Sequence, residues 1–282
     1  MLDQTLRPSV LFRDAGHVCL CFRESDQTSV ESNQYVIVHA EHAAILDPGG
    51  DLSFKGLLQA LGEHIDMSKL DYILASHQDP DVIASLPRWL LHSSAQVVIP
   101  ALWERFLPHL VSDMISDHLK VHLAERLVAL PDAGGRIHLA GAQILVLPAH
   151  FLHSPGNFSY YDTHARVLFS GDIGSATNVR DLHDVVEDFQ AHEPALRAFH
   201  QRYMSSNSVA RRWIAMIRQL DVQIIAPQHG PSFVGPTMVE QFLSWLETLP
   251  MGVDRIDELP YEIPPLSTEE AIEDTQAKTS AQ

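Results

Sequence analysis

Short apolar runs alternate with longer amphipathic stretches along the first half of the chain, and turn residues separate them. Apolar runs of strand length occupy residues 35–38, 43–47, 71–76 and 96–100, whereas residues 54–64 carry apolar side chains at helical spacing. Short apolar runs between Gly, Pro, Asn and Asp are typical of β-strands, and a 3.6-residue period is typical of a helix. The alternation predicts a layered α/β domain.

The second half of the chain alternates in the same way, with a different order of elements. We expect a long, histidine-rich helix over residues 101–126, two helices within residues 181–220 and a final amphipathic helix over residues 237–249. Strands are expected at residues 136–139, 143–147, 158–161, 167–169 and 222–226.

The composition changes after residue 250. Three prolines interrupt the tail, and its eight acidic residues face only two basic ones, Arg255 and Lys278. A segment with few apolar residues and an excess of one charge has little surface to bury. The sequence therefore predicts one folded domain over residues 1–250 and an acidic tail over residues 251–282 that is extended or disordered.

The charge balance limits the partners of the chain. Its 282 residues include 19 Lys and Arg against 36 Asp and Glu, a formal net charge of −17. Such a surface repels phosphate backbones and anionic lipids, so we expect neither nucleic acid nor a membrane as a partner. No apolar run of about 18 residues occurs, and the first residues lack the pattern of a secretory signal. We expect a cytoplasmic protein.

Cys19 and Cys21 are the two cysteines of the chain. Their spacing places both thiols on one face of a predicted strand, too close and too parallel for an easy disulfide. We interpret them as buried core thiols.

Three side chains that can bind metal ions lie within five residues, directly after the strand predicted at residues 71–76. They are His77, Asp79 and Asp81. Because alternate residues of an extended segment point the same way, the three can converge on one spot. The alternative is an exposed turn in which Asp81 caps the helix that follows.

Three more candidate ligands follow, each near the end of a predicted strand. His153 precedes a Pro-Gly turn, Asp172 lies close to two glycines, and His229 comes after the last predicted strand. Singly, each has an ordinary explanation as a turn residue or a hydrogen-bonded imidazole. Their occurrence together with the first loop, in this order, favours a metal site.

This order of motifs resembles the metallo-β-lactamase superfamily, which has a His-x-(His, Glu or Asp)-x-Asp loop followed by a His, an Asp and a last His. A carboxylate at the second loop position, here Asp79, is typical of its flavodiiron branch, and the segments around His153, Asp172 and His229 are similar to flavodiiron segments. The resemblance covers about residues 15–250. It implies an αββα sandwich, in which two mixed β-sheets pack face to face with helices outside.

The resemblance also implies a pair of metal ions and their ligands. One ion would be held by His77, Asp79 and His153, a second by Asp81 and His229, and Asp172 would bridge the two. A set rich in carboxylates favours iron, with zinc and manganese as alternatives.

Two positions depart from the flavodiiron pattern. Asp79 is one methylene shorter than the usual Glu, so the metal ion or the loop has to shift. Val82 stands where the family has a histidine ligand of the second ion, and a valine binds no metal. That ion would take an extra water, bind weakly, or recruit another imidazole such as His150 or His183.

Flavodiiron reductases carry a fused flavodoxin-like domain that delivers electrons. We expect neither that domain nor a bound flavin here, since no phosphate-binding Gly-rich loop occurs. The resemblance thus implies a stand-alone di-iron protein that binds dioxygen, either to sense it or to reduce it with electrons from a separate partner protein. Tyr203 is a candidate hydroxyl in the dioxygen pocket.

Two other functions stay open. The His-Ser-Pro-Gly turn at residues 153–156 resembles the hydrolase version of the fold, which points to a metal-bound hydroxide that attacks a phosphodiester, thioester or lactone. Alternatively, the metal site is a structural or signalling relic and the acidic tail docks a partner. The resemblance also makes a homodimer an expected assembly.

Overall fold

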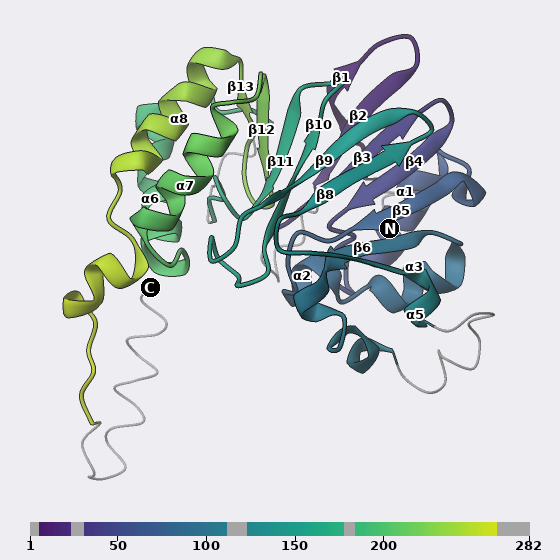
Figure 1. Ribbon diagram of the computed structural model, residues 1–282. Helices are drawn as coiled ribbons and strands as arrows, with labels where there is room; N and C mark the ends of the chain where they lie inside the picture. Colours follow the sequence, from purple (N-terminus) through teal and green to yellow (C-terminus); the bar gives the residue numbers. More distant parts are fainter. Residues whose placement is uncertain (1–5, 24–30, 112–122, 178–183, 264–282) are drawn as a thin grey trace, which may run out of the picture.

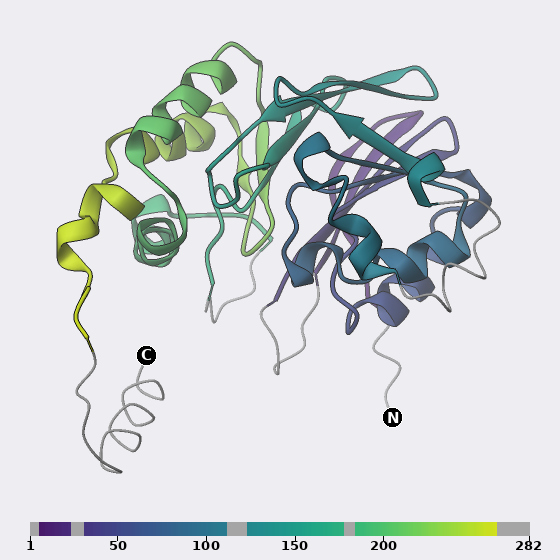
Figure 2. The ribbon, with the colours of Figure 1, turned by 60° about the horizontal axis from the view of Figure 1, so that its bottom comes forward.

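The computed structural model describes residues 6–23, 31–111, 123–177 and 184–263. Their backbone forms two mixed β-sheets, and helices lie on the outer side of each sheet (Figure 1). A view from another side shows the two groups of helices on opposite sides of the paired sheets (Figure 2). The predicted αββα sandwich is confirmed.

The first sheet has seven strands in chain order, and the direction of pairing changes at its centre. Strands β1 to β4 form an antiparallel meander, whereas β4 to β7 are parallel neighbours. The strands are β1 (Ser9–Arg13), β2 (His17–Arg23), β3 (Asn33–His39), β4 (His42–Leu46), β5 (Leu70–Leu74), β6 (Gln96–Pro100) and β7 (Leu127–Leu130).

The second sheet has six strands in the order β13-β12-β11-β10-β9-β8. Only β11 and β12 are parallel neighbours among these described strands, and every other pair is antiparallel. The strands are β8 (Gly135–Leu139), β9 (Ala142–Pro148), β10 (Phe158–Asp162), β11 (Val167–Gly171), β12 (Ile224–Pro227) and β13 (Phe233–Val234).

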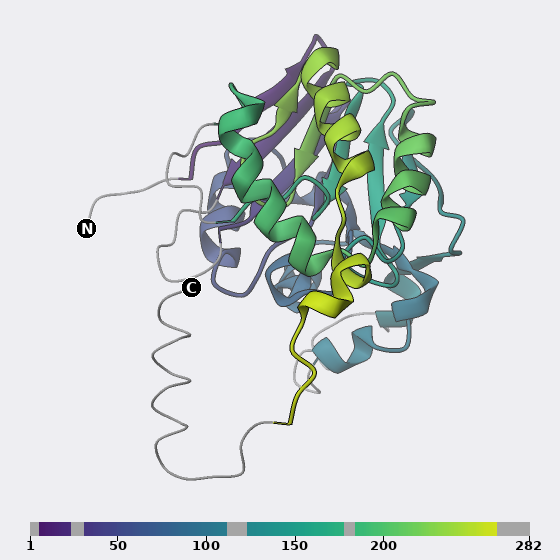
Figure 3. The same ribbon diagram turned by 90° about the vertical axis from the view of Figure 1, so that its left-hand side faces the viewer.

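The helices divide into one group per sheet. On the first sheet lie α1 (Phe54–Gly62), α2 (Pro80–Ile83), α3 (Leu86–His92) and α5 (Leu123–Arg126). On the second lie α6 (Phe189–Tyr203), α7 (Asn207–Ile217) and α8 (Pro236–Thr248), which stand in front of the strands in Figure 3. The helices expected at residues 54–64, 181–220 and 237–249 are confirmed.

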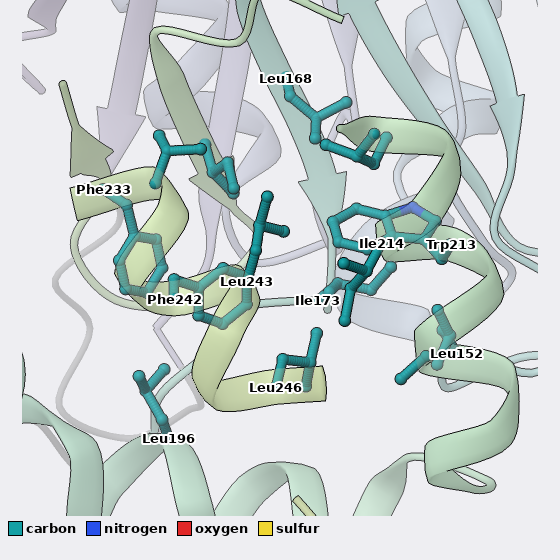
Figure 4. Close-up of a cluster of buried hydrophobic side chains, with 14 of the residues drawn as sticks. Leu152, Leu168, Ile173, Leu196, Trp213, Ile214, Phe233, Phe242, Leu243 and Leu246 are labelled. Atoms are coloured by element: carbon teal, nitrogen blue, oxygen red, sulfur yellow. The ribbon is translucent and has the colours of Figure 1, made fainter. Parts of the chain in front are cut away.

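Three apolar clusters hold the layers together. One lies between the two sheets and includes Tyr35, Phe158 and both cysteines, which are free and buried as predicted. A second lies between the first sheet and its helices. The third joins the second sheet to α6, α7 and α8, where Trp213 and Phe242 are prominent (Figure 4). The interiors of all three are close-packed, so the strand ends are held in fixed positions.

The long helix expected over residues 101–126 is not formed in the part of that range that the structure describes. Its described part has two 3-10 turns, η2 (Ala101–Trp103) and η3 (Leu107–Leu110), and the short α5. Pro108 lacks the N–H that an α-helix interior needs. Three apolar side chains of this stretch, Leu102, Phe106 and Leu110, are exposed rather than packed on a helix face.

The folded part continues past the expected boundary at residue 250. Met251 is fully buried, and η4 (Gly252–Glu258) forms 3-10 turns beside α6. The carboxylate of Asp254 accepts hydrogen bonds from the backbone N–H groups of Asn207 and Met251, which fixes this turn to the start of α7. The tail stays a prediction for residues 264–282, which lie outside the described residues.

Candidate metal centre

The six predicted ligands are brought together at one end of the sandwich. They all come from segments that follow strands: His77, Asp79 and Asp81 after β5, His153 after β9, Asp172 after β11, and His229 after β12. All except His77 line a pocket of about 550 Å³, and the imidazole of His77 is buried behind it with 1% of its surface exposed.

The loop after β5 turns both of its carboxylates toward histidines. Asp79 is the N-cap residue of α2 but makes no capping bond, and its Oδ2 lies 2.8 Å from Nε2 of His153. That hydrogen bond outweighs burial and lowers the pKa of Asp79. Asp81, in the first turn of α2, lies with Oδ2 3.3 Å from Nε2 of His229. The Asp79 side chain, although one methylene shorter than a Glu, therefore reaches His153. The N-cap residue of α2 is Asp79, so Asp81 does not cap that helix.

His153 is presented by a strained turn. Its φ is 82° and that of Phe151 is 64°, and residues other than glycine rarely adopt this left-handed backbone region. The backbone N–H of Phe151 donates to the carbonyl of Ser154 at 2.7 Å, and the Ser154 hydroxyl donates to Oε1 of Gln78 at 2.5 Å. Strain of about 1–3 kcal/mol per residue persists only where the surroundings enforce it, and functional sites are common places for it.

Asp172 lies between the two halves of the group. Its Oδ2 is 3.8 Å from Nε2 of His77 and 3.7 Å from Nε2 of His153, while its Oδ1 is 3.6 Å from Nε2 of His229. Asp172 is only 3% exposed, and Oδ1 is buried without a hydrogen-bond partner in the described structure. An unpaired buried carboxylate oxygen is costly, and a cation between it and His229 would satisfy it.

Gly171 permits this placement of Asp172. Its φ is +61°, and a Cβ there would lie 3.2 Å from Cβ and Oγ of Ser76, at the end of the other sheet. The backbone N–H of Phe158 donates to the carbonyl of Ser76 at 2.9 Å and joins the sheets at the same place. A side chain at position 171 would therefore separate the two strand ends that carry the ligands.

The imidazole of His77 is fixed by a hydrogen-bonded relay that ends in a buried carboxylate. Its Nδ1–H donates to Oγ of Ser76 at 2.9 Å, and this hydroxyl donates to Oδ2 of Asp47 at 2.9 Å. Burial raises the pKa of Asp47 to about 6. The relay leaves Nε2 of His77 facing Asp79 and Asp172, which is the orientation that a metal ligand needs.

His229 is oriented in the same way by a backbone group. Its Nδ1–H donates to the carbonyl of Glu31 at 2.6 Å, so Nε2 faces Asp81 and Asp172. Burial alone would lower the pKa of His229, but the two carboxylates outweigh it and raise the pKa to about 9. A metal ion at this position would have to displace that proton.

Sequence reasoning missed Asp47 and His200. The buried His200 donates through Nδ1 to the carbonyl of Leu196 at 2.7 Å and accepts through Nε2 from the backbone N–H of Gly174 at 3.0 Å. It thus fixes the turn that carries Asp172. Asp47 had a visible signal, since it is an acidic residue at the end of a buried strand, whereas His200 has none in a helix of ordinary composition.

A family model described as ODP family beta lactamase matches residues 30–230. The chain belongs to the ODP family. The apo state of the chemotaxis sensor ODP from T. denticola is 39% identical to it, covers 90% of this chain and 98% of that chain, and superposes with a TM-score of 0.77. A structure of the peroxy diiron species of chemotaxis sensor ODP is 38% identical and covers 89% and 100% of the two chains, with a TM-score of 0.78.

More distant relatives of this ODP family member are flavoproteins. The putative diflavin flavoprotein A 4 of Synechocystis sp. is 25% identical over 232 residues, which are 78% of this chain and 36% of that protein. The chain spans about a third of the length of the curated relatives it matches. A flavo di-iron protein mutant of Thermotoga maritima, 16% identical over 86% of this chain and 61% of that chain with a TM-score of 0.67, shares the fold. The predicted resemblance is confirmed.

Val82, which stands where flavodiiron proteins have a histidine, points away from the pocket in this ODP family member. Val82 is fully buried and belongs to the apolar cluster under α2. His150 does not replace it, because its Nε2 lies 2.7 Å from the carbonyl oxygen of Asp132 and it does not line the pocket. His183 lies outside the described residues. Among the described residues, the second half of the predicted ligand group therefore consists of Asp81, Asp172 and His229.

The mouth of the pocket is partly aromatic. Tyr203 and Phe199 of α6 line it with ring centroids 4.8 Å apart, and the Tyr203 ring lies 5.7 Å from that of His153. Tyr203 is 52% exposed, so it forms the rim rather than the floor. The lining residues include carboxylates but neither lysine nor arginine, so the described pocket carries an excess of negative charge that suits cations. No helix of the described residues is long and apolar enough to cross a membrane.

Proposed function

We propose that this chain holds two iron ions and binds dioxygen between them and the aromatic rim. The observation that carries the proposal is the placement of Asp172, whose two oxygens face two separate groups of side chains. His77, Asp79 and His153 would hold one ion, Asp81 and His229 the other, and Asp172 would bridge them. Three imidazoles and three carboxylates form a set that suits iron or manganese, although zinc accepts the same ligands.

The residues around the proposed ions have separate tasks. The Asp47–Ser76 relay and the Glu31 carbonyl hold His77 and His229 with Nε2 toward the pocket. Phe199 and Tyr203 give the rim an aromatic lining, and the Tyr203 hydroxyl is the candidate proton donor there. When bound, a pair of ferrous ions supplies the electrons that dioxygen takes up; the chain supplies geometry and a shielded pocket.

We infer that the use of this chemistry is oxygen sensing. The support is the identity of 38–39% to the chemotaxis sensor ODP over nearly the whole of that chain. Reduction of dioxygen by a separate electron-donor protein is the competing use. A sensor completes one reaction with dioxygen and then stops, whereas a reductase consumes its donor continuously.

Anaerobic loading with ferrous iron tests the proposal. The full chain should retain two irons, and exposure to air should produce new visible absorption of ferric iron. Asp221→Ala, at an exposed ion pair with Arg166, serves as a control that should behave like the wild type. Tight zinc in place of iron, no spectral response to air and cleavage of a generic phosphodiester would replace the proposal with hydrolysis.

A further inference from the structure

A second cluster of metal-binding side chains lies at the opposite end of the sandwich. In the described part of the chain, two groups of three such side chains have ligand atoms within 4.8 Å of one another: His77 with His153 and Asp172, and His17 with Cys19 and Asp162. β2 runs about 20 Å from His17 to Arg23, whose guanidinium reaches the carbonyl of Gly230 beside the first site. The two clusters are therefore separate.

The second cluster connects the two sheets. His17 and Cys19 belong to β2 of the first sheet, and Asp162 ends β10 of the second (Figure 1). Nε2 of His17 lies 2.7 Å from Oδ2 of Asp162, and Sγ of Cys19 lies 3.6 Å from each of these atoms. All three side chains are buried, with at most 1% of their surface exposed.

These distances are close to the edges of a tetrahedral zinc site. Zn–N and Zn–O bonds of about 2.0 Å and a Zn–S bond of about 2.3 Å imply about 3.5 Å between nitrogen and sulfur and about 3.3 Å between nitrogen and oxygen. Both sulfur distances already match, and only the His17–Asp162 pair has to open, by about 0.6 Å. The first site, around Asp172, has a similar spread of distances. His153 and Asp79 form one short pair at 2.8 Å, and the other distances among its ligand atoms are 3.7–3.8 Å.

The cluster contains a buried carboxylate, to which a cation can bind. Asp162 is fully buried, and its described hydrogen-bond partners are His17, Cys19 and the backbone N–H groups of His164 and Ala165, none of them a lysine or arginine. Burial raises the pKa of the Cys19 thiol well above its usual range, and the Asp162 carboxylate raises it further. A buried carboxylate beside a buried thiol is stabilised by a divalent ion that takes the place of protons.

The outer histidines complete the arrangement. Nδ1 of His17 lies 3.2 Å from Nδ1 of His39, so His17 can donate its second N–H there while Nε2 binds metal, which is the usual arrangement of a ligating imidazole. The His164 ring stacks on that of His17 at 4.6 Å between centroids and is hydrogen-bonded to the exposed Asp14. The His164 side chain is 41% exposed, so the cluster lies beneath a ring that reaches the surface.

We propose that His17, Cys19 and Asp162 form a further metal site that binds one zinc ion and clamps the two sheets together. A thiolate, an imidazole and a carboxylate together suit an ion of intermediate softness, which zinc is. On binding, a Zn–S bond forms as the S–H bond of Cys19 breaks, and Nε2 of His17 binds the metal as it gives up the proton that it shares with Asp162. Both protons leave to solvent. The metal remains divalent, so no oxidant or reductant is needed.

Cobalt(II) is a spectroscopic substitute for zinc. Its absorption distinguishes this site from the first site, around Asp172, because the first site contains no thiolate. We expect the apo full chain to bind three cobalt ions and to show sulfur-to-cobalt charge-transfer absorption. Cys19→Ser should lose that absorption and keep two ions. Cys21→Ser, at an equally buried thiol two residues away on β2, should keep three ions and the absorption.

A variant that lacks the first site makes the cobalt experiment independent of the proposed function. Asp172→Ala should keep one cobalt ion, and with it the thiolate absorption. Two ions in the wild type without thiolate absorption, or absorption that persists in a folded Cys19→Ser protein, would overturn the proposal. Since the wild-type result alone can refute it, the test stands even if Cys19→Ser fails to fold.

Discussion

Asp172 lies with one carboxylate oxygen toward His77 and the other toward His229, at 3.8 Å and 3.6 Å from their Nε2 atoms. The two histidines follow strands of different sheets. A single side chain thus contacts both halves of the ligand group, and no other predicted ligand does so.

Asp172→Ala should therefore remove both irons rather than one. The carboxylate is the shared ligand, and without it each remaining group has at most three side chains and the two cations repel each other unscreened. Iron per chain after anaerobic loading and desalting measures the effect, with near-zero content expected. If this variant kept two irons while folded by circular dichroism, the ligand assignment would be wrong.

Asp47→Asn should weaken the ion held by His77 without removing that ligand. The Asp47 carboxylate accepts from both the N–H and the hydroxyl of Ser76, whereas an amide offers one accepting oxygen and an NH2 group that cannot accept the second bond, so the imidazole of His77 is held less firmly. Partners of this kind typically contribute about 10- to 100-fold in metal affinity. Competition with a chelator measures the affinity of each site. Asp71→Asn, which makes the same change beside another histidine, His42, elsewhere in the fold, should leave both affinities unchanged.

The stability of the metal-free protein should fall between about pH 6.5 and pH 9. The pKa of His229 is raised from 6.5 to about 9, so the folded state holds a proton that the unfolded state releases in this range. The stabilisation is complete below pH 6.5 and is lost as the pH rises through 9, and it amounts to roughly 3 kcal/mol. Urea unfolding at several pH values measures it.

His229→Gln should reduce that pH dependence to the part that His153 contributes, because the hydrogen bond to Asp79 and the charge of Asp172 raise the pKa of His153 as well. His42→Gln, at a half-exposed imidazole, should preserve it. Iron uptake at pH 7 should release a proton for the same reason, which a weakly buffered solution with a pH indicator would register.

His200→Ala should destabilise the fold by about 3 kcal/mol, because it leaves the N–H of Gly174 buried without an acceptor and opens a cavity. His192→Ala, on the same helix, loses an imidazole whose Nε2 has no partner in the described structure, and should cost about 1 kcal/mol or less. Urea midpoints compare the two. Equal losses would mean that the hydrogen bond to Gly174 contributes nothing.

The stability that His200 contributes should be lost at acid pH, whereas that of His229 is lost at alkaline pH. Burial lowers its pKa from 6.5 to about 4, so the folded state keeps the ring neutral while the unfolded state takes up a proton. Stability from this group is present above pH 6.5 and is lost as the pH falls toward 4. In His200→Ala that acid-side loss should be smaller, which the same urea series would reveal.

The sequence predicted the ligand group because each ligand follows an apolar strand, and strand ends of one sandwich meet. It could not predict the partners of Asp47 and His200, since Ser76 and Gly174 lie far away in the chain and the contacts depend on packing. Only the place of Asp47 at the end of an apolar run was visible. The helix expected over residues 101–126 was wrong for the described residues of that range, because helical spacing of apolar residues says nothing about whether a sheet is available to cover them. The bounds of α1 and α8 were predictable from their amphipathic period.

The contact between the segments after β5 and β11 has a kinetic consequence. His77 and Asp172 belong to different sheets and lie far apart in sequence, so they meet only after the two sheets have docked. Such non-local contacts form late in folding. An unfolded or half-folded chain would offer iron only isolated pairs of ligands from the first loop. The arrival of tightly held metal should thus report that the last large folding step, the closure of one sheet on the other, is complete.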